Sequence, residues 1–265
     1  MTNTRPLTLR EAKRWIGANS TTNPFGQTSK MPGKSYGLDA FACQRGSELA
    51  KNDRSPCARC YARRNFYATW GPVIKNRQGH QRAVEQIGQS GNRWTEAMIY
   101  LMRHYLGNER WFRWHDSGDF HSLEHVAAVC EVARATPWLS HWVPTHEPRM
   151  VGAYLDNGGR IPDNLVIRLS ADFIGQPFQA PYAYRHELAG LPTSTTHEGE
   201  GAKPVQVSER RGDSVECMSY KRDHTCGNCR ACWSPKVKNV SYPLSGGDAA
   251  PARAKRAAAL RVLEV

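Results

Sequence analysis

The sequence contains no long apolar run. None of its segments approaches the roughly 20 consecutive apolar residues that a membrane-spanning helix requires. Its first eight residues carry one arginine, Arg5, and no apolar stretch of the kind that a secretory signal contains. We therefore expect a protein that does not enter a membrane and that works in the cytoplasm.

Acidic residues are also scarce relative to basic ones. The 265 residues include 24 Asp and Glu against 36 Lys and Arg, which gives a formal net charge of +12. Such an excess attracts polyanions and favours a nucleic acid or a nucleotide as partner, although a merely basic surface is the alternative. Basic side chains gather around two cysteine-rich segments: Lys51, Arg54, Arg59, Arg63, Arg64, Lys221, Arg222 and Arg230.

The cysteines do not form a pattern typical of disulfides. Cytoplasmic thiols stay reduced, which favours metal binding. Seven of the eight cysteines fall into a front set and a rear set: Cys43, Cys57 and Cys60, then Cys217, Cys226, Cys229 and Cys232. Gaps of two residues let a tight turn aim neighbouring sulfurs at one ion or cluster. The rear set has enough thiols to close a metal site, whereas the front set leaves one metal corner open.

The middle of the chain alternates between strand and helix patterns. The expected order is a helix at 75–89, a helix at 93–106, a strand at 110–115, a helix capped by Ser122, a strand at 139–143, a helix from Thr145 to about Asp156 and a strand at 164–169. Cys130 lies on the apolar stripe of the helix after Ser122 and is expected in the core. This order predicts right-handed βαβ units and a parallel sheet that curls into a partial (β/α) barrel.

We expect a single α/β domain over residues 1–265. Its parts are a front cysteine segment at 25–70, a βα core at 71–210, a rear cysteine segment at 211–240 and a basic tail at 241–265. One more strand is expected at 203–207 and a terminal helix at 252–263.

Ligands of parallel sheets bind at the carboxyl ends of the strands. Three successive strand ends carry ionisable and polar residues: His115, Asp116, Ser117, Gly118 and Asp119, then His146 and Glu147, then Arg168, Ser170 and Asp172. Asp116 or Asp119 can instead cap the following helix, and His146 and Glu147 can be ordinary first-turn residues. The convergence of three strand ends favours a functional pocket.

Several motifs resemble known families. Cys57-Ala-Arg-Cys60-Tyr61 is similar to the end of the cluster-binding loop of radical S-adenosylmethionine (SAM) enzymes. A closer resemblance is to a phage family of uncharacterised proteins that is named for a numbered gene product. It covers about residues 25–245 and includes Ser29–Met31, the front cysteine pattern, the block from Arg113 to Asp119 and the closing cysteines with Trp233. A phage origin would place the protein in the host cytoplasm.

The resemblance to radical SAM enzymes implies a 4Fe–4S cluster on Cys43, Cys57 and Cys60, with the fourth iron open to SAM. The turn Ser117-Gly118-Asp119 would contact the amine of the cofactor, with Ser170 nearby. The candidate catalytic residues are His115, Asp116, Asp119, His146 and Arg168, of which His115, Asp119 and Arg168 would orient the cofactor.

Three hypotheses remain open from the sequence. In the first, the chain is a radical-SAM-like enzyme that acts on a nucleotide or nucleic acid, and the rear site is an auxiliary cluster. In the second, one or two clusters support nucleic-acid binding without turnover, with bases stacking on Trp70, Trp111, Trp114 or Trp233. In the third, the rear site holds zinc as a structural staple.

Overall fold

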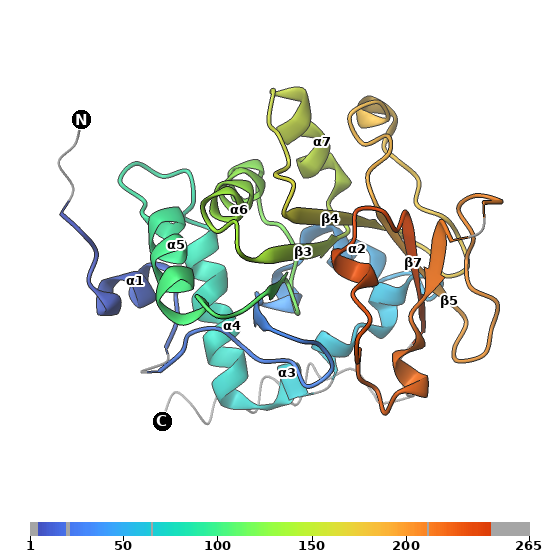
Figure 1. The fold of residues 1–265 in the computed structure, drawn as a ribbon, viewed down its shortest axis with the longest axis horizontal. Helices are drawn as coiled ribbons and strands as arrows, with labels where there is room; N and C mark the ends of the chain where they lie inside the picture. Colours follow the sequence, from blue (N-terminus) through green and yellow to red (C-terminus); the bar gives the residue numbers. More distant parts are fainter. Residues whose placement is uncertain (1–4, 20–21, 65, 211, 245–265) are drawn as a thin grey trace.

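The computed structural model describes residues 5–19, 22–64, 66–210 and 212–244. Its centre is one seven-stranded sheet with the order β1-β2-β3-β4-β5-β7-β6 (Figure 1). The strands are β1 (Lys34–Tyr36), β2 (Trp111–Trp114), β3 (Ser140–Thr145), β4 (Leu165–Ser170), β5 (Thr193–His197), β6 (Ser214–Glu216) and β7 (Asn239–Pro243). Every neighbouring pair is parallel, so all strands end at the same edge.

Helices cover the sheet and connect its strands. The α-helices are α1 (Leu9–Trp15), α2 (Gln44–Leu49), α3 (Phe66–Thr69), α4 (Gly71–Val84), α5 (Trp94–Tyr105), α6 (Leu123–Ala135) and α7 (Pro148–Asp156). Short 3₁₀ turns are η1 (Ala40–Ala42), η2 (Pro56–Arg59), η3 (Tyr61–Arg63), η4 (Tyr182–Tyr184), η5 (Met218–Lys221) and η6 (Ala231–Trp233). Helix α1 packs on α5, α5 on α6 and α6 on α7. No helix in the described ranges is long and apolar enough to cross a membrane.

The sheet and helices form where the sequence supplies buried apolar faces. Strand β4 is buried along nearly its whole length, as expected for a strand covered on both faces. Helix α6 begins where the Ser122 hydroxyl accepts the His125 N–H at 3.2 Å, and its apolar stripe includes the fully buried Cys130. One large apolar cluster joins these helices to the sheet. A second, smaller cluster packs η6 against β3 and β4 and consists of Trp142, Val166 and Trp233.

The sequence predictions for this middle region are confirmed in type and order. Strands β2, β3 and β4, the Ser122 cap and the core position of Cys130 are found as expected. Thr145 was predicted to cap α7 but ends β3 instead, and the helix begins only at Pro148. The helix predicted at 75–89 begins earlier, at Gly71, because Pro72 suits the first turn, and it ends at Val84.

The sequence analysis did not predict the strands at either end of the sheet correctly. Strand β1 and strands β5, β6 and β7 were not predicted, and the strand expected at 203–207 is a loop. Strand β5 reads Thr-Ser-Thr-Thr-His and β6 has only three residues, so neither shows an apolar pattern. The parallel sheet is confirmed, whereas its closure into a barrel stays a prediction. The helix expected at 252–263 lies outside the described residues.

A buried histidine braces β3 against its neighbours. The Trp114 indole N–H donates to His141 Nδ1 at 3.2 Å, and Nε2 lies 2.9 Å from the Thr136 hydroxyl. Since Nδ1 accepts, Nε2 carries the proton of a neutral ring. Burial lowers the pKa of His141 to about 3, and burial together with the charge of Arg77 lowers the pKa of His80 to about 3 as well.

This arrangement predicts acid sensitivity. Between about pH 6.5 and pH 3 the unfolded chain binds protons that the folded chain excludes, so stability falls as the pH falls through that range. At about pH 5.5 each such histidine lowers the free energy of unfolding by about 1.4 kcal/mol relative to its value above pH 7. Urea unfolding at about pH 7.5 and 5.5 should show that His141→Gln loses about 1.4 kcal/mol less on acidification than the wild type. Equal losses in the two proteins would contradict this account of His141.

Candidate functional site

The front cysteines lie on tight turns that face one space. Cys43 directly precedes α2, Cys57 lies in η2 and Cys60 follows it. The Cys57 N–H donates to the Ser55 hydroxyl at 3.3 Å, and the Cys60 N–H donates to the Cys57 carbonyl at 3.3 Å. A β-carbon placed on Gly46 would lie 3.8 Å from Cys43 Sγ and 3.9 Å from Cys57 Sγ. The two sulfurs therefore flank the same small volume.

The three thiols also affect one another's pKa values through electrostatic repulsion between their thiolate forms. Burial, then the charges of Asp119, Cys60 and Cys57, raise the pKa of Cys43 well above its ordinary value. Burial and the charge of Cys57 likewise raise the pKa of Cys60. Thiolates are the metal-binding form, and a bound cation would remove this mutual repulsion. Three thiols are a donor set whose chemistry suits an iron–sulfur cluster.

Asp119 joins the ends of two neighbouring strands beside these thiols. It follows β2, and its carboxylate accepts the Thr145 hydroxyl at 2.6 Å and the His146 N–H at 2.7 Å. Burial raises the pKa of Asp119, although these hydrogen bonds oppose the shift. Gly118 adopts φ +82° and a β-carbon there would lie 2.5 Å from the Leu38 side chain, so the turn requires glycine.

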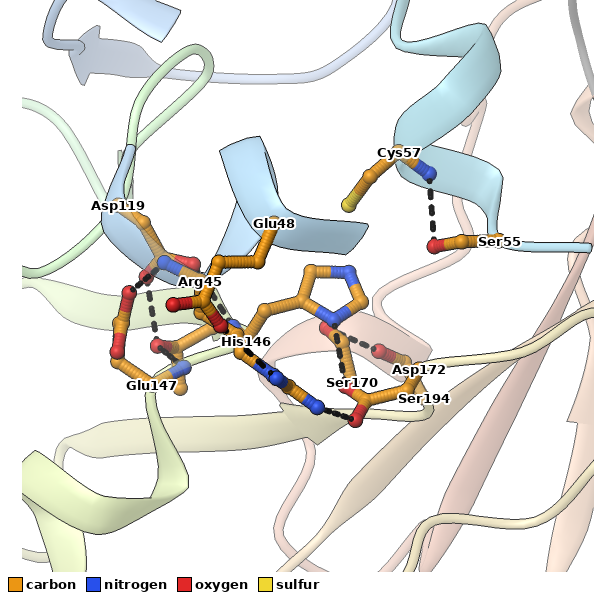
Figure 2. Close-up of polar contacts among 11 residues, drawn as sticks. Arg45, Glu48, Ser55, Cys57, Asp119, His146, Glu147, Ser170, Asp172 and Ser194 are labelled. Atoms are coloured by element: carbon orange, nitrogen blue, oxygen red, sulfur yellow. Dashed lines mark hydrogen bonds and ion pairs between the residues drawn. The ribbon is translucent and has the colours of Figure 1, made fainter. Parts of the chain in front are cut away.

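The ends of β3 and β4 meet the front segment through a polar network (Figure 2). His146 Nδ1 lies 3.6 Å from one carboxylate oxygen of Asp172, and Arg45 Nη2 donates to the other at 2.7 Å. The Arg45 backbone N–H donates to Glu147 at 2.8 Å. Burial would lower the pKa of His146, but the neighbouring side chains of Cys57, Asp172 and Asp119 raise it to about 10. Burial and Asp119 raise the pKa of Glu147 to about 7.

Asp116 serves the packing of the N-terminal segment. Its Oδ2 accepts from Arg77 at 2.7 Å, forming a buried ion pair, and from Ser35 at 3.1 Å and Tyr67 at 3.2 Å. A β-carbon on Gly37 would lie 1.9 Å from Asp116 Oδ1, so this contact depends on glycine. Asp116 was predicted as a catalytic candidate, and the structure directs its side chain to this ion pair.

His115 is buried in an unusual backbone conformation. Its φ is +52°, a value that favours glycine, and neither ring nitrogen has a hydrogen-bond partner among the described residues. Its ring contacts Phe120 and His125, with centroids 4.9 Å and 5.3 Å away. Burial and the charge of Arg113 lower the pKa of His115 to about 3, so the ring is neutral.

The rear cysteines gather around the end of β7. The Cys229 N–H donates to the Cys226 carbonyl at 2.9 Å, and Cys232 Sγ lies 3.1 Å from the Tyr242 hydroxyl. Burial, then Cys217 and Cys229, raise the pKa of Cys226, and burial raises the pKa of Cys232 to about 12. Cys217 and Cys226 also act on the pKa of Cys232, so the four thiols are linked electrostatically through Cys226. Four thiols have the donor chemistry that a cluster or zinc requires. In the described ranges no three of them lie close enough to share a single ion.

Arg168 holds the rear loop instead of a cofactor. Its guanidinium donates five hydrogen bonds, all to backbone carbonyls: Cys232 at 3.1 Å, Thr193 at 3.1 Å, Val237 at 3.0 Å, Ala231 at 2.7 Å and Ser234 at 2.9 Å. A guanidinium has five donors, so none remains for a ligand. The expectation that Arg168 orients a cofactor is corrected accordingly, because its side chain reaches the rear segment.

A chain of contacts connects the two cysteine sites. Tyr61 follows Cys60, and its hydroxyl accepts from Arg113 at 3.3 Å. The Arg113 guanidinium lies 4.8 Å from the centre of the Trp142 ring, and Trp142 lies 5.1 Å from Trp233, the neighbour of Cys232. The sequence analysis did not predict this series of contacts. The alternation of side chains along β2 could have indicated it, because that alternation places Trp111 and Arg113 on one face and Phe112 and Trp114 on the other.

Comparison with known proteins identifies the family. The model of a family described as Gene product 88 matches residues 7–235, most of the chain. The chain belongs to the Gene product 88 family. No curated protein and no solved structure matches it significantly. The span shared with Gene product 88 includes all cysteines of both sites.

Within the described ranges, no three His, Cys, Asp or Glu side chains lie close enough to share a single metal ion.

The role of Arg168 can be tested by stability. Arg168→Met removes all five of these hydrogen bonds, so we expect the free energy of unfolding to fall by about 3 kcal/mol or more. Arg134→Met is the matched control, since Arg134 is exposed and donates to a single carbonyl, that of Arg160, at 3.1 Å. The control should lose about 0.5 kcal/mol or less in urea unfolding. Similar losses for both variants would refute the structural role of Arg168.

Proposed function

We propose that the chain is an iron–sulfur enzyme of the radical-SAM-like kind that acts on a nucleotide or nucleic acid. The observation that carries the proposal is the meeting of three front thiols with the carboxyl ends of β2, β3 and β4. Asp119 influences the pKa of Cys43, and Cys57 influences that of His146. A metal corner left open by three cysteines would therefore face polar groups from three strands.

The residues of the chain would divide the work as follows. Cys43, Cys57 and Cys60 would hold the cluster, which supplies one-electron chemistry when bound. Asp119 keeps the β2 and β3 ends together, and Asp172 with Arg45 closes the front segment over the β4 end. Ser117 donates to the Leu38 carbonyl at 2.7 Å, and Ser170 pairs with Ser194 at 3.0 Å, so both hydroxyls already have partners in the fold.

The rear site would be auxiliary. The contacts from Tyr61 through Arg113 and Trp142 to Trp233 offer a compact route between the two cysteine sets. An electron could pass along it to the front site. Zinc at the four rear thiols is the alternative, and the site would then only staple the loop.

The enzyme hypothesis is tested by product formation. Anaerobically purified protein, reduced with dithionite and mixed with SAM, should release 5′-deoxyadenosine. Cys57→Ser should abolish the product because the front site loses a ligand. Cys130→Ala should retain it, since Cys130 is buried in the apolar core. Iron-loaded wild type that yields no product, or Cys57→Ser that matches the wild type, would contradict the proposal.

Nucleic-acid binding without turnover is the second candidate, and an exposed aromatic pair favours it. Phe66 and Trp70 are 53% and 49% exposed, with ring centroids 4.6 Å apart and planes 33° from parallel. Residues 51–75 around them contain six basic residues and one acidic residue. Of the other tryptophans considered for stacking, Trp114 and Trp233 are buried, and Trp111 lies under the Arg230 guanidinium at 5.2 Å.

Base stacking on this pair predicts a clear loss of affinity. Replacing Phe66 and Trp70 by alanine should weaken binding of a fluorescent oligothymidylate by about tenfold or more, because stacking contributes about 1–3 kcal/mol per base. Tyr182→Ala is the control, since Tyr182 is 80% exposed and lies on another element, η4. Fluorescence anisotropy at fixed salt measures both. If the control loses as much affinity as the double variant, stacking at this pair is ruled out.

A further inference from the structure

His146 stands between a front cysteine and a carboxylate. It directly follows β3, its backbone N–H is fixed by Asp119 at 2.7 Å, and its side chain is only 19% exposed. Among the described residues Nδ1 forms no hydrogen bond, and it lies 3.6 Å from a carboxylate oxygen of Asp172. Figure 2 shows the Cys57 sulfur pointing toward the ring from the side opposite Asp172. Because Nδ1 is turned to Asp172, Nε2 is the nitrogen available to a metal at the front thiols.

An imidazole with one nitrogen facing a carboxylate and the other facing a metal ligand is the usual arrangement of a metal-bound histidine. A ligating histidine usually turns its second nitrogen to a carboxylate, which fixes the ring and its tautomer. Asp172 is itself fixed by Arg45 at 2.7 Å, and Arg45 lies two residues after Cys43. The segment that carries a front cysteine thus also holds the carboxylate that orients His146.

We propose that His146 Nε2 is the fourth protein ligand of the front site and closes the metal corner that the three cysteines leave open. Mixed cysteine and histidine ligation is chemically suited to iron–sulfur clusters. On binding, the metal would replace any proton on Nε2, since a ligating imidazole nitrogen must be deprotonated. The imidazole would be a displaceable cap, which a substrate or cofactor must replace to reach the metal. The inference rests on the proposed front cluster, and it adds His146 as ligand and Asp172 as the positioning residue.

The test is a spectroscopic one that needs no turnover. The full chain is grown with ¹⁵N-labelled histidine, purified anaerobically and reduced, and nitrogen hyperfine coupling to the cluster is measured by pulsed EPR. The wild type should show strong coupling to one imidazole nitrogen. His146→Ala should lose it, whereas the exposed His186→Ala should keep it. Asp172→Asn should retain the cluster but weaken or broaden the coupling, because the ring is no longer held.

A substitution by another ligand keeps the test decisive if His146→Ala fails to fold. His146→Cys should bind iron at the wild-type level without any nitrogen coupling, since a thiolate can take the same corner. Iron-loaded wild type without strong nitrogen coupling would overturn the role of His146 and leave the proposed enzyme intact. Wild type that binds no iron at the front cysteines would overturn both.

Discussion

The parallel pairing of β2, β3 and β4 is the constraint on which the rest of the structure depends. Because these strands run in the same direction side by side, their carboxyl ends meet at one edge of the sheet. Asp119, His146 and Asp172 each follow one of these ends, and none is near another in sequence. The front segment closes over the edge through Arg45, which binds Asp172, and through Gln44, which donates to the His121 carbonyl at 3.0 Å. The three front cysteines are thereby placed above the strand ends.

A buried cation organises the rear site in a comparable way. Arg168 projects from β4, and four of its five hydrogen bonds fix the loop that carries Cys232. The fifth goes to Thr193 in the neighbouring strand β5. A buried charge is costly unless its donors are satisfied, and here four carbonyls of the rear segment and the Thr193 carbonyl of β5 satisfy all five. The same sheet therefore positions both cysteine sets. One set lies beyond the strand ends, and the other is tied to the sheet through Arg168 and the stack of Trp142 and Trp233.

The sequence predicts the middle of this fold well because its signals there are local. The Ser122 cap, the apolar stripe with Cys130 and the apolar strand β4 each reveal their element without tertiary information. Strand β5 is polar and is stable only between β4 and β7, so no local pattern reveals it. The site is similar. Strand-end logic identifies Asp119 and His146, but the destinations of Asp116 and Arg168 depend on Arg77 and on the rear carbonyls, which are distant in sequence.

The central claim is that both cysteine sets of this Gene product 88 chain hold iron–sulfur clusters. Metal and sulfide content of anaerobically purified protein, measured together with its EPR spectrum after reduction, tests it most directly. The account predicts brown protein with about eight irons per chain and the signals of two four-iron clusters. Colourless protein that carries a single zinc ion and no iron would contradict it.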